Sequence, residues 1–338
     1  MLGNLTHRML LAGALACLAT LAQGSVAAQT LVMATDRIGT ILHAGAAGMA
    51  SIVSKHSQTH IVTSTYGGQD PYVVALERGE ADMALISAFG SWLQLKGQNP
   101  SKTEYKKMRI LRASQGGLLQ SFVTLQASGI KKIAELKGKR LATDFLATPL
   151  LQLSTTGSLA TVGLGLKDIV KVPVSGISDA LAALGQGRID STWTAFGVPA
   201  LQEINASNPV RYLPIPDSPE ALEILRQALY PGVRVTRVQP NPRLFVTEPT
   251  PMVDYDIYLV VRADLQNERI RPVLGALWEH SDEMMKIHPM LANFKQAGAV
   301  TELAVLPYHP EAVAFYRSKG MWTDDMQKVQ EKYESRVR

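Results

Sequence analysis

The chain has one cysteine, Cys17, in 338 residues, so no disulfide can form within it. Its stability must therefore come from burial of apolar surface, and a chain of this length can bury a sufficient core. The length alone predicts two domains. Beyond residue 30, no apolar run approaches the roughly 20 residues that span a bilayer.

Aromatic residues are scarce, at 6% of the chain, and no aromatic stripe accompanies the basic residues, which argues against nucleic-acid binding. The net charge of +5 is spread among interspersed acidic and basic residues, apart from the run KKIAELKGKR at 131–140. That run indicates either a solvated helix face or a docking surface for a membrane partner. No GxxxxGK[ST] or GxGxxG loop is present, so nucleotide binding has no support.

The N-terminal segment is typical of a secretory signal peptide. A basic start ends at Arg8, an apolar core runs from Met9 to Ala22, and small residues follow. This order predicts export with cleavage near Ala27 or Ala28, so that residues 1–28 are removed and the mature protein is periplasmic. The core of about 14 residues is too short for a membrane anchor. A lipoprotein with ALAC as its lipid-attachment box is the weaker alternative.

The following residues alternate between strand and helix patterns. A helical stripe of apolar and small residues begins at Ile41, and Asp70 followed by Pro71 predicts the N-cap and first position of a second helix. Three short apolar runs bounded by turns predict strands: 31–35, 61–65 and 81–87. This β-α-β-α-β order implies a parallel sheet with right-handed crossovers.

The same pattern recurs 108 residues later without an insertion. ATDRIGT at 34–40 is matched by ATDFLAT at 142–148, and Asp70 is matched by Ser178, another residue suited to a helix N-cap. We interpret the two copies as two lobes of like construction, the alternative being that any two such units share caps and glycine stops. The second copy predicts two strands and one helix: 170–174, 189–195 and 178–184.

Two lobes of this kind predict an α/β protein with a ligand cleft between them. We expect residues 29–115 and 246–338 to form the first lobe and residues 116–245 the second, because a strand and helices follow the proline-rich segment 239–252. Such a double crossing permits hinge closure on a ligand. Ligands of open α/β sheets lie outside the carboxyl ends of the strands. Helix N-termini are expected there, and their unpaired N–H groups suit an anion such as a carboxylate.

Five runs follow one another over residues 30–325: IGTILHAGAAGMASIVSKH, TYGGQDPYVVALERGEADMALIS, IKKIAELKGKRLAT, GRIDSTWTAFGVPALQEI and LPYHPEAVAFYRSKGMW. Together they resemble the TAXI-type receptors of TRAP transporters, which are extracytoplasmic solute-binding proteins. The resemblance implies the type II periplasmic-binding-protein fold, with two lobes, an interlobe cleft and two crossover segments. It also implies capture of a small organic anion (an amino acid, a 2-oxo acid or a dicarboxylate) and its delivery to TRAP-type permease subunits. We expect a monomer.

The first-lobe ligand candidates gather at the expected strand ends and helix starts. The Thr40 hydroxyl suits either a helix cap or a ligand carboxylate. Arg37 could neutralise Asp36 or bind the ligand in bidentate fashion, and a ligand ammonium could also neutralise an aspartate. The alternative is that Asp36 only closes an Asx-turn. The candidates are Asp36, Arg37, Gly39, Thr40, Gly68, Gln69, Ser87 and Phe89.

The second-lobe candidates are their counterparts, with one residue on the returning strand. Trp193 is either a wall of the cleft or a core aromatic, and Tyr255 either offers a hydroxyl near the crossing or packs on the sheet. Asp144 raises the same question as Asp36, because two carboxylates would repel an anion unless paired. The candidates are Thr143, Asp144, Thr148, Gly176, Trp193, Phe196 and Tyr255.

Catalytic and metal chemistry is thinly represented. His56 and His60 are four residues apart, but no third ligand is near in the sequence, so we expect no metal. We also expect no cofactor and no enzymatic activity. The rival function is a periplasmic lyase or dehydratase on the same scaffold, with Asp36 or Asp144 as its acid or base. A third is a receptor that presents its ligand-bound form to a membrane sensor.

Overall fold

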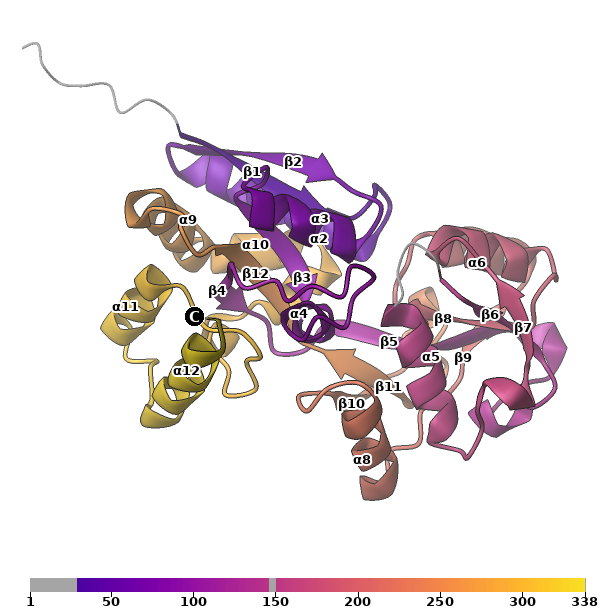
Figure 1. Ribbon diagram of the computed structural model, residues 1–338. Helices are drawn as coiled ribbons and strands as arrows, with labels where there is room; N and C mark the ends of the chain where they lie inside the picture. Colours follow the sequence, from indigo (N-terminus) through magenta and orange to yellow (C-terminus); the bar gives the residue numbers. More distant parts are fainter. Residues whose placement is uncertain (1–28, 146–149, 338) are drawn as a thin grey trace, which may run out of the picture.

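The computed structural model of the protein describes residues 29–145 and 150–337. The chain forms two lobes that lie side by side (Figure 1). The N-terminal part, in indigo, and the C-terminal part, in yellow, share one lobe, whereas the middle of the chain forms the other. In the part of the chain that is described, none of the helices has the length and apolar character of a membrane span.

The first lobe is built on a mixed sheet. Its strands within the described residues are β1 (Gln29–Thr35), β2 (Thr59–Thr65), β3 (Met83–Ser87), β12 (Ile257–Arg262) and β4 (Met108–Ala113). They lie in the order β2-β1-β3-β12-β4, with β1, β2 and β3 parallel as predicted and β12 antiparallel to both neighbours. The helices of this lobe are α2 (Ile41–His56), α3 (Gln69–Arg78), α4 (Ala88–Leu95), α9 (Asn267–Glu279), α10 (Ser281–Ile287), α11 (Pro310–Ser318) and α12 (Asp324–Val337).

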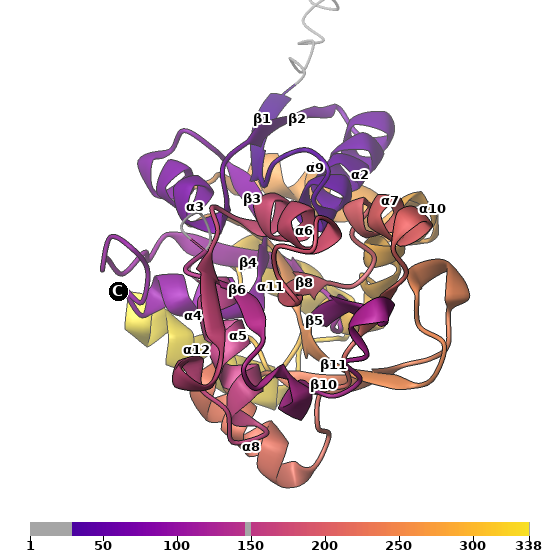
Figure 2. The same ribbon diagram turned by 90° about the vertical axis from the view of Figure 1, so that its right-hand side faces the viewer.

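The second lobe has a larger sheet. Its described strands are β5 (Leu118–Leu125), β6 (Arg140–Thr143), β7 (Val170–Pro173), β8 (Ser191–Ala195), β9 (Val210–Tyr212), β10 (Arg234–Val238) and β11 (Thr250–Tyr255). They lie in the order β10-β11-β5-β8-β6-β7, with β9 paired to β5. Its helices are α5 (Leu150–Ala160), α6 (Ile177–Gly185), α7 (Ala200–Ser207) and α8 (Pro219–Ala228). Figure 2 views this lobe end on, with α6 and α7 on one side of the strands and α5 and α8 on the other.

Short 3-10 helices complete the chain. They are η1 (Gln126–Ser128), η2 (Ile133–Leu136), η3 (Leu166–Asp168), η4 (Pro242–Leu244), η5 (Pro289–Asn293) and η6 (Gln296–Gly298).

The predicted repeat is confirmed at the level of strand register. The order β2-β1-β3 in the first lobe is reproduced as β7-β6-β8 in the second. In the first lobe Thr35 pairs with Thr65, and 108 residues on Thr143 pairs with Pro173. The β1–β3 and β6–β8 pairings keep the same offset. Two lobes of like construction are therefore present.

An aspartate occupies the same position in each copy. Asp82 Oδ2 accepts a hydrogen bond from the backbone N–H of Val32 at 2.9 Å, and Asp190 Oδ2 accepts one from Arg140 N at 2.7 Å. Each aspartate precedes the third strand of its unit and accepts a hydrogen bond from the backbone of the first, at Val32 in the middle of β1 and at Arg140 at the start of β6. The repeat thus extends to a side-chain contact that ties neighbouring strands together.

The helix starts differ from the prediction. Asp70 and Ser178 were expected as N-caps, but the caps are Gly68 and Gly176, and both polar residues lie in the first turn of their helices. The prediction of Asp70 and Ser178 as caps was therefore wrong, because glycine is also accepted at that position and each helix starts earlier.

Gly45 and Gly48 of α2 allow this helix to lie close to its neighbours, of which the nearest are residues of the C-terminal part of the chain. A Cβ on Gly45 would lie 1.6 Å from Met290 Cε and 3.0 Å from Leu85 Cδ2, and one on Gly48 would lie 2.7 Å from Leu291 Cδ1. The helix therefore packs tightly against η5, which comes from the C-terminal part of the chain.

The chain passes between the lobes twice. The first passage, between β4 and β5, is made by residues 114–117, and the second, between β11 and β12, is made by Asp256. The sequence suggested one continuous strand here and a return to the first lobe at residue 246, whereas by hydrogen bonding β11 belongs to the second sheet and the chain changes sheets at Asp256. Residues 114–117 and Asp256 are called the crossover region below.

Candidate functional site

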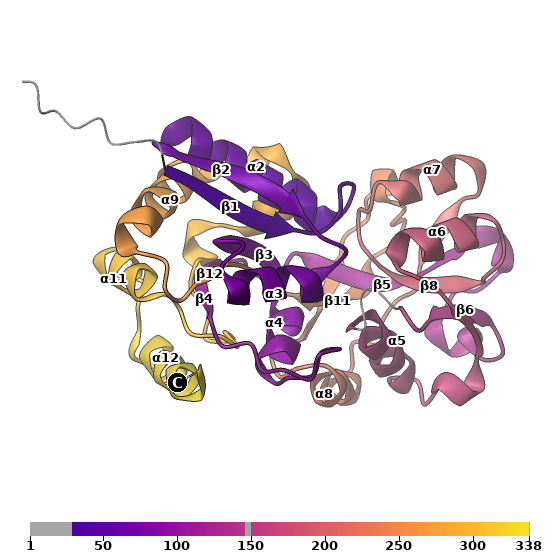
Figure 3. The same ribbon diagram turned by 45° about the horizontal axis from the view of Figure 1, so that its top comes forward.

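The carboxyl ends of the first-lobe strands are directed toward the second lobe. Figure 3 shows the arrowheads of β1 and β2 at the side of the first lobe that faces the second. The loop after β1 makes a tight turn at Gly39, whose φ of +88° favours glycine. Thr40 follows as the N-cap of α2: its hydroxyl accepts from His43 N at 3.3 Å and donates to Arg37 O at 2.8 Å. The hydroxyl thus donates one hydrogen bond and accepts another within the loop and the first turn of α2, in agreement with its prediction as a helix cap.

The N-terminus of α3 has no such side-chain cap. Its cap residue is Gly68, and no side chain within the described chain bonds the first-turn N–H groups there. Gln69 follows, is almost fully buried, and accepts a hydrogen bond from Ser87 Oγ at 3.1 Å. Ser87 also caps α4 by accepting from Gly90 N at 3.0 Å. The structure therefore brings the candidates Gln69 and Ser87 together beside an uncapped helix end.

Asp36, at this edge of the sheet, has a strongly raised side-chain pKa. Its side chain is partly exposed as a whole, but Oδ1 is buried and has no hydrogen-bond partner among the described residues. Burial raises the pKa of this carboxyl to about 7. The adjacent Thr35 Oγ1 is likewise buried without a described partner. Among the described residues, these two polar atoms at the end of β1 thus lack the hydrogen-bond partners that buried polar groups usually have.

Arg37 does not neutralise Asp36. It is exposed, and within the described residues it forms no ion pair with that carboxylate. A Cβ built on Gly67 would lie 3.6 Å from Arg37 Nη2, which places the guanidinium over the β2–α3 turn. The neutralising role was therefore wrong, because the guanidinium lies beside Gly67 and forms no ion pair with Asp36 in the described chain, whereas a role in holding a ligand anion stays a prediction.

The second-lobe edge matches the first only in part. Thr143 is fully buried at the end of β6, and Asp144 is exposed with a left-handed φ of +53°. Asp144 N donates to Gln152 Oε1 at 2.8 Å. Thr148 lies outside the described residues. At α6, Gly176 is the N-cap, and no described side chain bonds the first-turn N–H groups.

The uncapped ends of α3 and α6 are therefore equivalents in the repeat, one in each lobe. An uncapped helix N-terminus carries unpaired N–H groups and a partial positive charge, which suits an anion. Asp36 and Asp144 are not equivalent in environment, since one has a buried oxygen and the other is exposed to solvent.

Trp193 belongs to the core. It is fully buried on β8, its ring meets Phe122 edge to face at 5.2 Å between centroids, and its Nε1 donates to Gln120 Oε1 at 3.0 Å. The interpretation of Trp193 as a cleft wall is wrong for this arrangement, because no part of the ring is accessible. Phe196 is partly exposed and packs against Tyr212 at 5.7 Å.

Phe89 and Tyr255 meet in an aromatic cluster that joins the lobes. Phe89, at the start of α4, lies 5.6 Å from Tyr255 on β11 and 5.8 Å from Tyr230 between ring centroids. The Tyr255 hydroxyl lies 3.1 Å from Ser154 Oγ on α5. The Tyr230 hydroxyl is buried and has no partner among the described residues. Sequence reasoning found Phe89 and Tyr255 but missed Tyr230 and Ser154, which carry no motif.

Two cavities lie next to these residues. One of about 330 Å³ adjoins the start of α3 and is lined by Gly67, Asp70, Pro71, Val74, Gln94, Asn99, Pro100, Ser101 and Tyr105. Burial raises the pKa of Asp70 in its wall, although a hydrogen bond from Gln94 lowers it. The other, of about 440 Å³, lies at the crossover region and is lined by Gln115, Gly117, Leu119, Arg234, Thr236, Asp254, Asp256, Asn293, Thr301 and Leu303. Neither was predicted from the sequence.

This arrangement of duplicated α/β lobes joined by two crossovers agrees with what is known of similar sequences. The model of the NMT1-like family matches residues 33–320. The chain belongs to the NMT1-like family. Among curated proteins, none matches this member of the family.

Solved structures agree on the fold. A structure described as a periplasmic transporter is 13% identical with a TM-score of 0.56, and the match covers 92% of this chain and 98% of the other. PhnD1 from Prochlorococcus marinus, in complex with methylphosphonate, is 14% identical with a TM-score of 0.52, covering 87% of this chain and 99% of that one. The predicted two-lobed α/β fold of periplasmic binding proteins is confirmed.

Proposed function

We propose that this NMT1-like protein is a periplasmic solute-binding receptor, exported by its N-terminal signal peptide, that captures a small organic anion between its lobes and delivers it to a TRAP-type permease. The observation that carries the proposal is the pair of uncapped helix N-termini at Gly68 and Gly176, which occupy equivalent positions in the two lobes. Closure about the crossover region would direct both toward one ligand. No step of this function requires catalysis.

The environment of Asp36 narrows the ligand class. An ionised carboxylate beside a bound anion is repulsive, so Asp36 binds either as a neutral acid or opposite a positive group. A 2-oxo acid or dicarboxylate would accept a hydrogen bond from protonated Asp36, whereas an amino acid would offer its ammonium to the ionised form. With a pKa of about 7, Asp36 is available in both forms near neutral pH.

The pH dependence of ligand binding separates these two classes of ligand. Binding of a simple anion should weaken as the pH rises above 7 and should survive Asp36→Asn, because asparagine still donates a hydrogen bond. Binding of an amino acid should weaken as the pH falls below 7 and should be lost in Asp36→Asn. Isothermal titration between pH 5.5 and 8.5 measures both.

The permease contact is assigned to the basic run at 131–140. The sequence suggested a helix face, but the structure has only the short η2 there, with Ile133 and Leu136 buried and the lysines exposed. An exposed cluster of lysines in the second lobe suits an acidic surface of a membrane partner. The exposed lysines are Lys131, Lys132, Lys137 and Lys139.

A thermal-shift screen tests the receptor function. Amino acids, 2-oxo acids, dicarboxylates, alkanesulfonates and methylphosphonate form its arms, and a ligand that binds only the folded form should raise the melting temperature with concentration. Native mass spectrometry of the purified protein would detect a ligand that is retained. If no organic acid raised the melting temperature, the proposed ligand class would be contradicted. If methylphosphonate alone raised it, a phosphonate would take the place of the organic anion in the proposal.

The second candidate is an enzyme, because Asp36 has the raised pKa that a general acid or base needs near neutral pH. Incubation with each acid that binds, followed by proton NMR of the small molecules, distinguishes the two. Unchanged ligand after prolonged incubation supports the receptor, and a product that Asp36→Asn abolishes supports the enzyme.

A further inference from the structure

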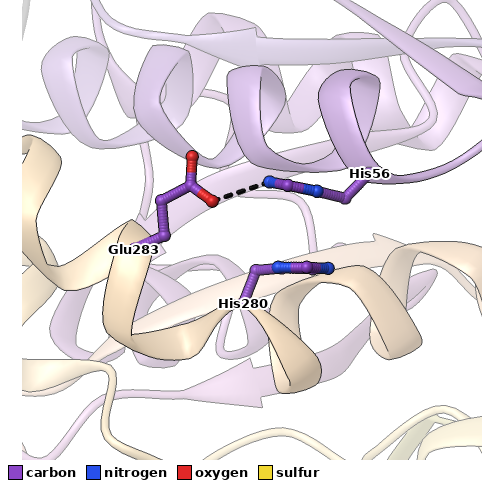
Figure 4. Close-up of side chains that lie close together, drawn as sticks. All are labelled: His56, His280 and Glu283. Atoms are coloured by element: carbon purple, nitrogen blue, oxygen red, sulfur yellow. Dashed lines mark hydrogen bonds and ion pairs between the residues drawn. The ribbon is translucent and has the colours of Figure 1, made fainter.

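A cluster of two histidines and a glutamate lies on the first lobe, away from the strand ends. Its members are His56, the last residue of α2, His280, between α9 and α10, and Glu283 in the first turn of α10 (Figure 4). One ligand atom from each lies within 4.8 Å of the other two. The sequence paired His56 with His60 and found no third ligand; folding brings two partners from the C-terminal part of the chain.

The three side chains are positioned for coordination by contacts between helices. His56 Nε2 lies 2.7 Å from Glu283 Oε2, and the His56 and His280 rings are stacked at 3.5 Å between centroids. No hydrogen bond fixes the His280 ring within the described residues, so it can turn. Figure 4 shows the His280 ring beside the His56 ring, with one of its nitrogens on the side of the Glu283 carboxylate.

We propose that His56, His280 and Glu283 bind a divalent transition-metal ion, with Zn²⁺ as the best match. Imidazole nitrogens and a carboxylate are ligands that zinc accepts, at about 2.0–2.2 Å, which separates ligand atoms by roughly 3.3 Å in a tetrahedral site. From spacings of up to 4.8 Å, this requires side-chain movements of roughly 1.5 Å. Three protein ligands leave the remaining position to water.

The electrostatic setting favours a cation. His56 ends a helix, where the backbone dipole presents its negative end. Glu283 Oε2 lies 2.7 Å from His56 Nε2, so the carboxylate is placed beside a ring nitrogen of the cluster. Lys55 Nζ, at 2.6 Å from Glu283 Oε1, competes for that carboxylate but is largely exposed and free to leave. The Glu283 side chain is 40% exposed, so an ion reaches it from solvent.

A bound ion would join α2 to the α9–α10 junction. It lies at the opposite end of α2 from Thr40, about 24 Å away for a helix of 16 residues. The site is therefore separate from the proposed ligand edge, and its occupancy should raise the stability of the first lobe by mass action without being needed for solute binding.

Isothermal titration of metal-stripped, untagged protein with ZnCl₂ at pH 7.5 tests the site. We expect a single ion per chain and a rise in melting temperature with zinc concentration. His280→Ala and Glu283→Gln should each weaken binding by roughly 10- to 100-fold or more, since losing even an outer-shell partner costs about that much. The matched control His60→Ala removes an exposed histidine of β2 outside the cluster and should leave the affinity unchanged. Lys55→Gln, which removes the competing cation, should leave it unchanged or tighter.

The proposal is overturned if no single-ion titration occurs, if both cluster variants bind zinc as the wild type does, or if His60→Ala loses as much affinity as they do. Far-UV circular dichroism establishes that each variant is folded. Should His280→Ala fail to fold, Glu283→Gln decides the question, because its side chain is partly exposed.

Discussion

Arg234 Nη2 donates to Asp256 Oδ1 at 2.5 Å, at the residue where the second passage between the lobes changes sheets. The same oxygen accepts from Gly116 N, in the first passage, at 2.6 Å. The Asp256 side chain is only 2% exposed. One buried carboxylate thus ties both passages of the crossover region together.

Arg234→Met should therefore destabilise the protein strongly. Methionine keeps much of the volume of arginine but leaves Asp256, and its neighbour Asp254, buried without their cation. Breaking a buried ion pair by removing one partner costs about 3–5 kcal/mol. Urea unfolding followed by circular dichroism measures the loss in the free energy of unfolding.

Arg237→Met is the matched control. Arg237 lies on the same strand and pairs with Asp217, but both side chains are about half exposed. An exposed ion pair contributes about 0–1 kcal/mol, so this variant should be nearly as stable as the wild type. If both variants lost the same free energy of unfolding, the cause would be the replacement of an arginine on this strand. The burial of the Asp256 carboxylate would then make no difference.

Asp36→Asn should be more stable than the wild type at neutral and alkaline pH. The carboxyl has a folded-state pKa of about 7 against an ordinary aspartate value of 3.8, so the folded state holds the proton more tightly. The wild type therefore loses stability relative to the variant as the pH rises from about 4 to 7, and the difference is constant above. We expect roughly 2–4 kcal/mol at pH 8, measured by urea unfolding at pH 5, 6, 7 and 8.

Asp144→Asn is the control for this pH series. Asp144 is the repeat counterpart of Asp36 but is exposed, so its replacement should change the free energy of unfolding little. A flat difference for Asp36→Asn would mean that its carboxyl is not desolvated.

The repeated units could be predicted from the sequence because short stretches of residues specify each strand, helix and turn. Apolar alternation and glycine stops specify each β-α-β-α-β unit, and the 108-residue offset survives in the pairings of Thr35 with Thr65 and Thr143 with Pro173. The change of sheet at Asp256 was missed, because its cause is a contact with Arg234 and Gly116 that no local pattern encodes.

Contacts between distant segments also explain what was missed at the sites. His56 meets His280 and Glu283 only after the C-terminal part of the chain returns to the first lobe. The core position of Trp193 follows from packing on Phe122 of a neighbouring strand, whereas the alternation of residues along its own strand leaves both faces open. Residue type and spacing identified the strand ends correctly, but burial decided which side chains remain accessible.

Removal of the Tyr255 hydroxyl and removal of the Tyr230 hydroxyl should affect the stability of the protein differently. Tyr255→Phe leaves the buried Ser154 hydroxyl without its partner at 3.1 Å, at a cost of about 1–3 kcal/mol. Tyr230→Phe removes a buried hydroxyl that has no described partner, so the unliganded protein should be unchanged or slightly more stable. Thermal unfolding without and with a ligand from the screen checks both. If Tyr230 contacts the ligand, its variant alone should lose affinity while keeping stability.

Asp82→Ala and Asp190→Ala should destabilise the protein by similar amounts. Each carboxylate accepts a hydrogen bond from a backbone N–H of the first strand of its unit, from Val32 and Arg140 respectively. Losing such a charged acceptor costs about 1.5–3 kcal/mol. The Arg140 side chain also lowers the pKa of Asp190, so that contribution is present above about pH 4 and is lost as the pH falls through the lowered pKa.

Asp325→Ala provides the reference for these two variants. Asp325 pairs with Lys328 on the surface of α12 with both side chains mostly exposed, and such a pair contributes about 0.3–0.5 kcal/mol. Urea unfolding at pH 7 and pH 3.5 measures all three. If the two lobes are equivalent in energy as well as in register, both aspartate variants should exceed the reference at pH 7, and the excess for Asp190→Ala should shrink at pH 3.5. A loss in one lobe alone would show that the duplicated contact stabilises only that lobe.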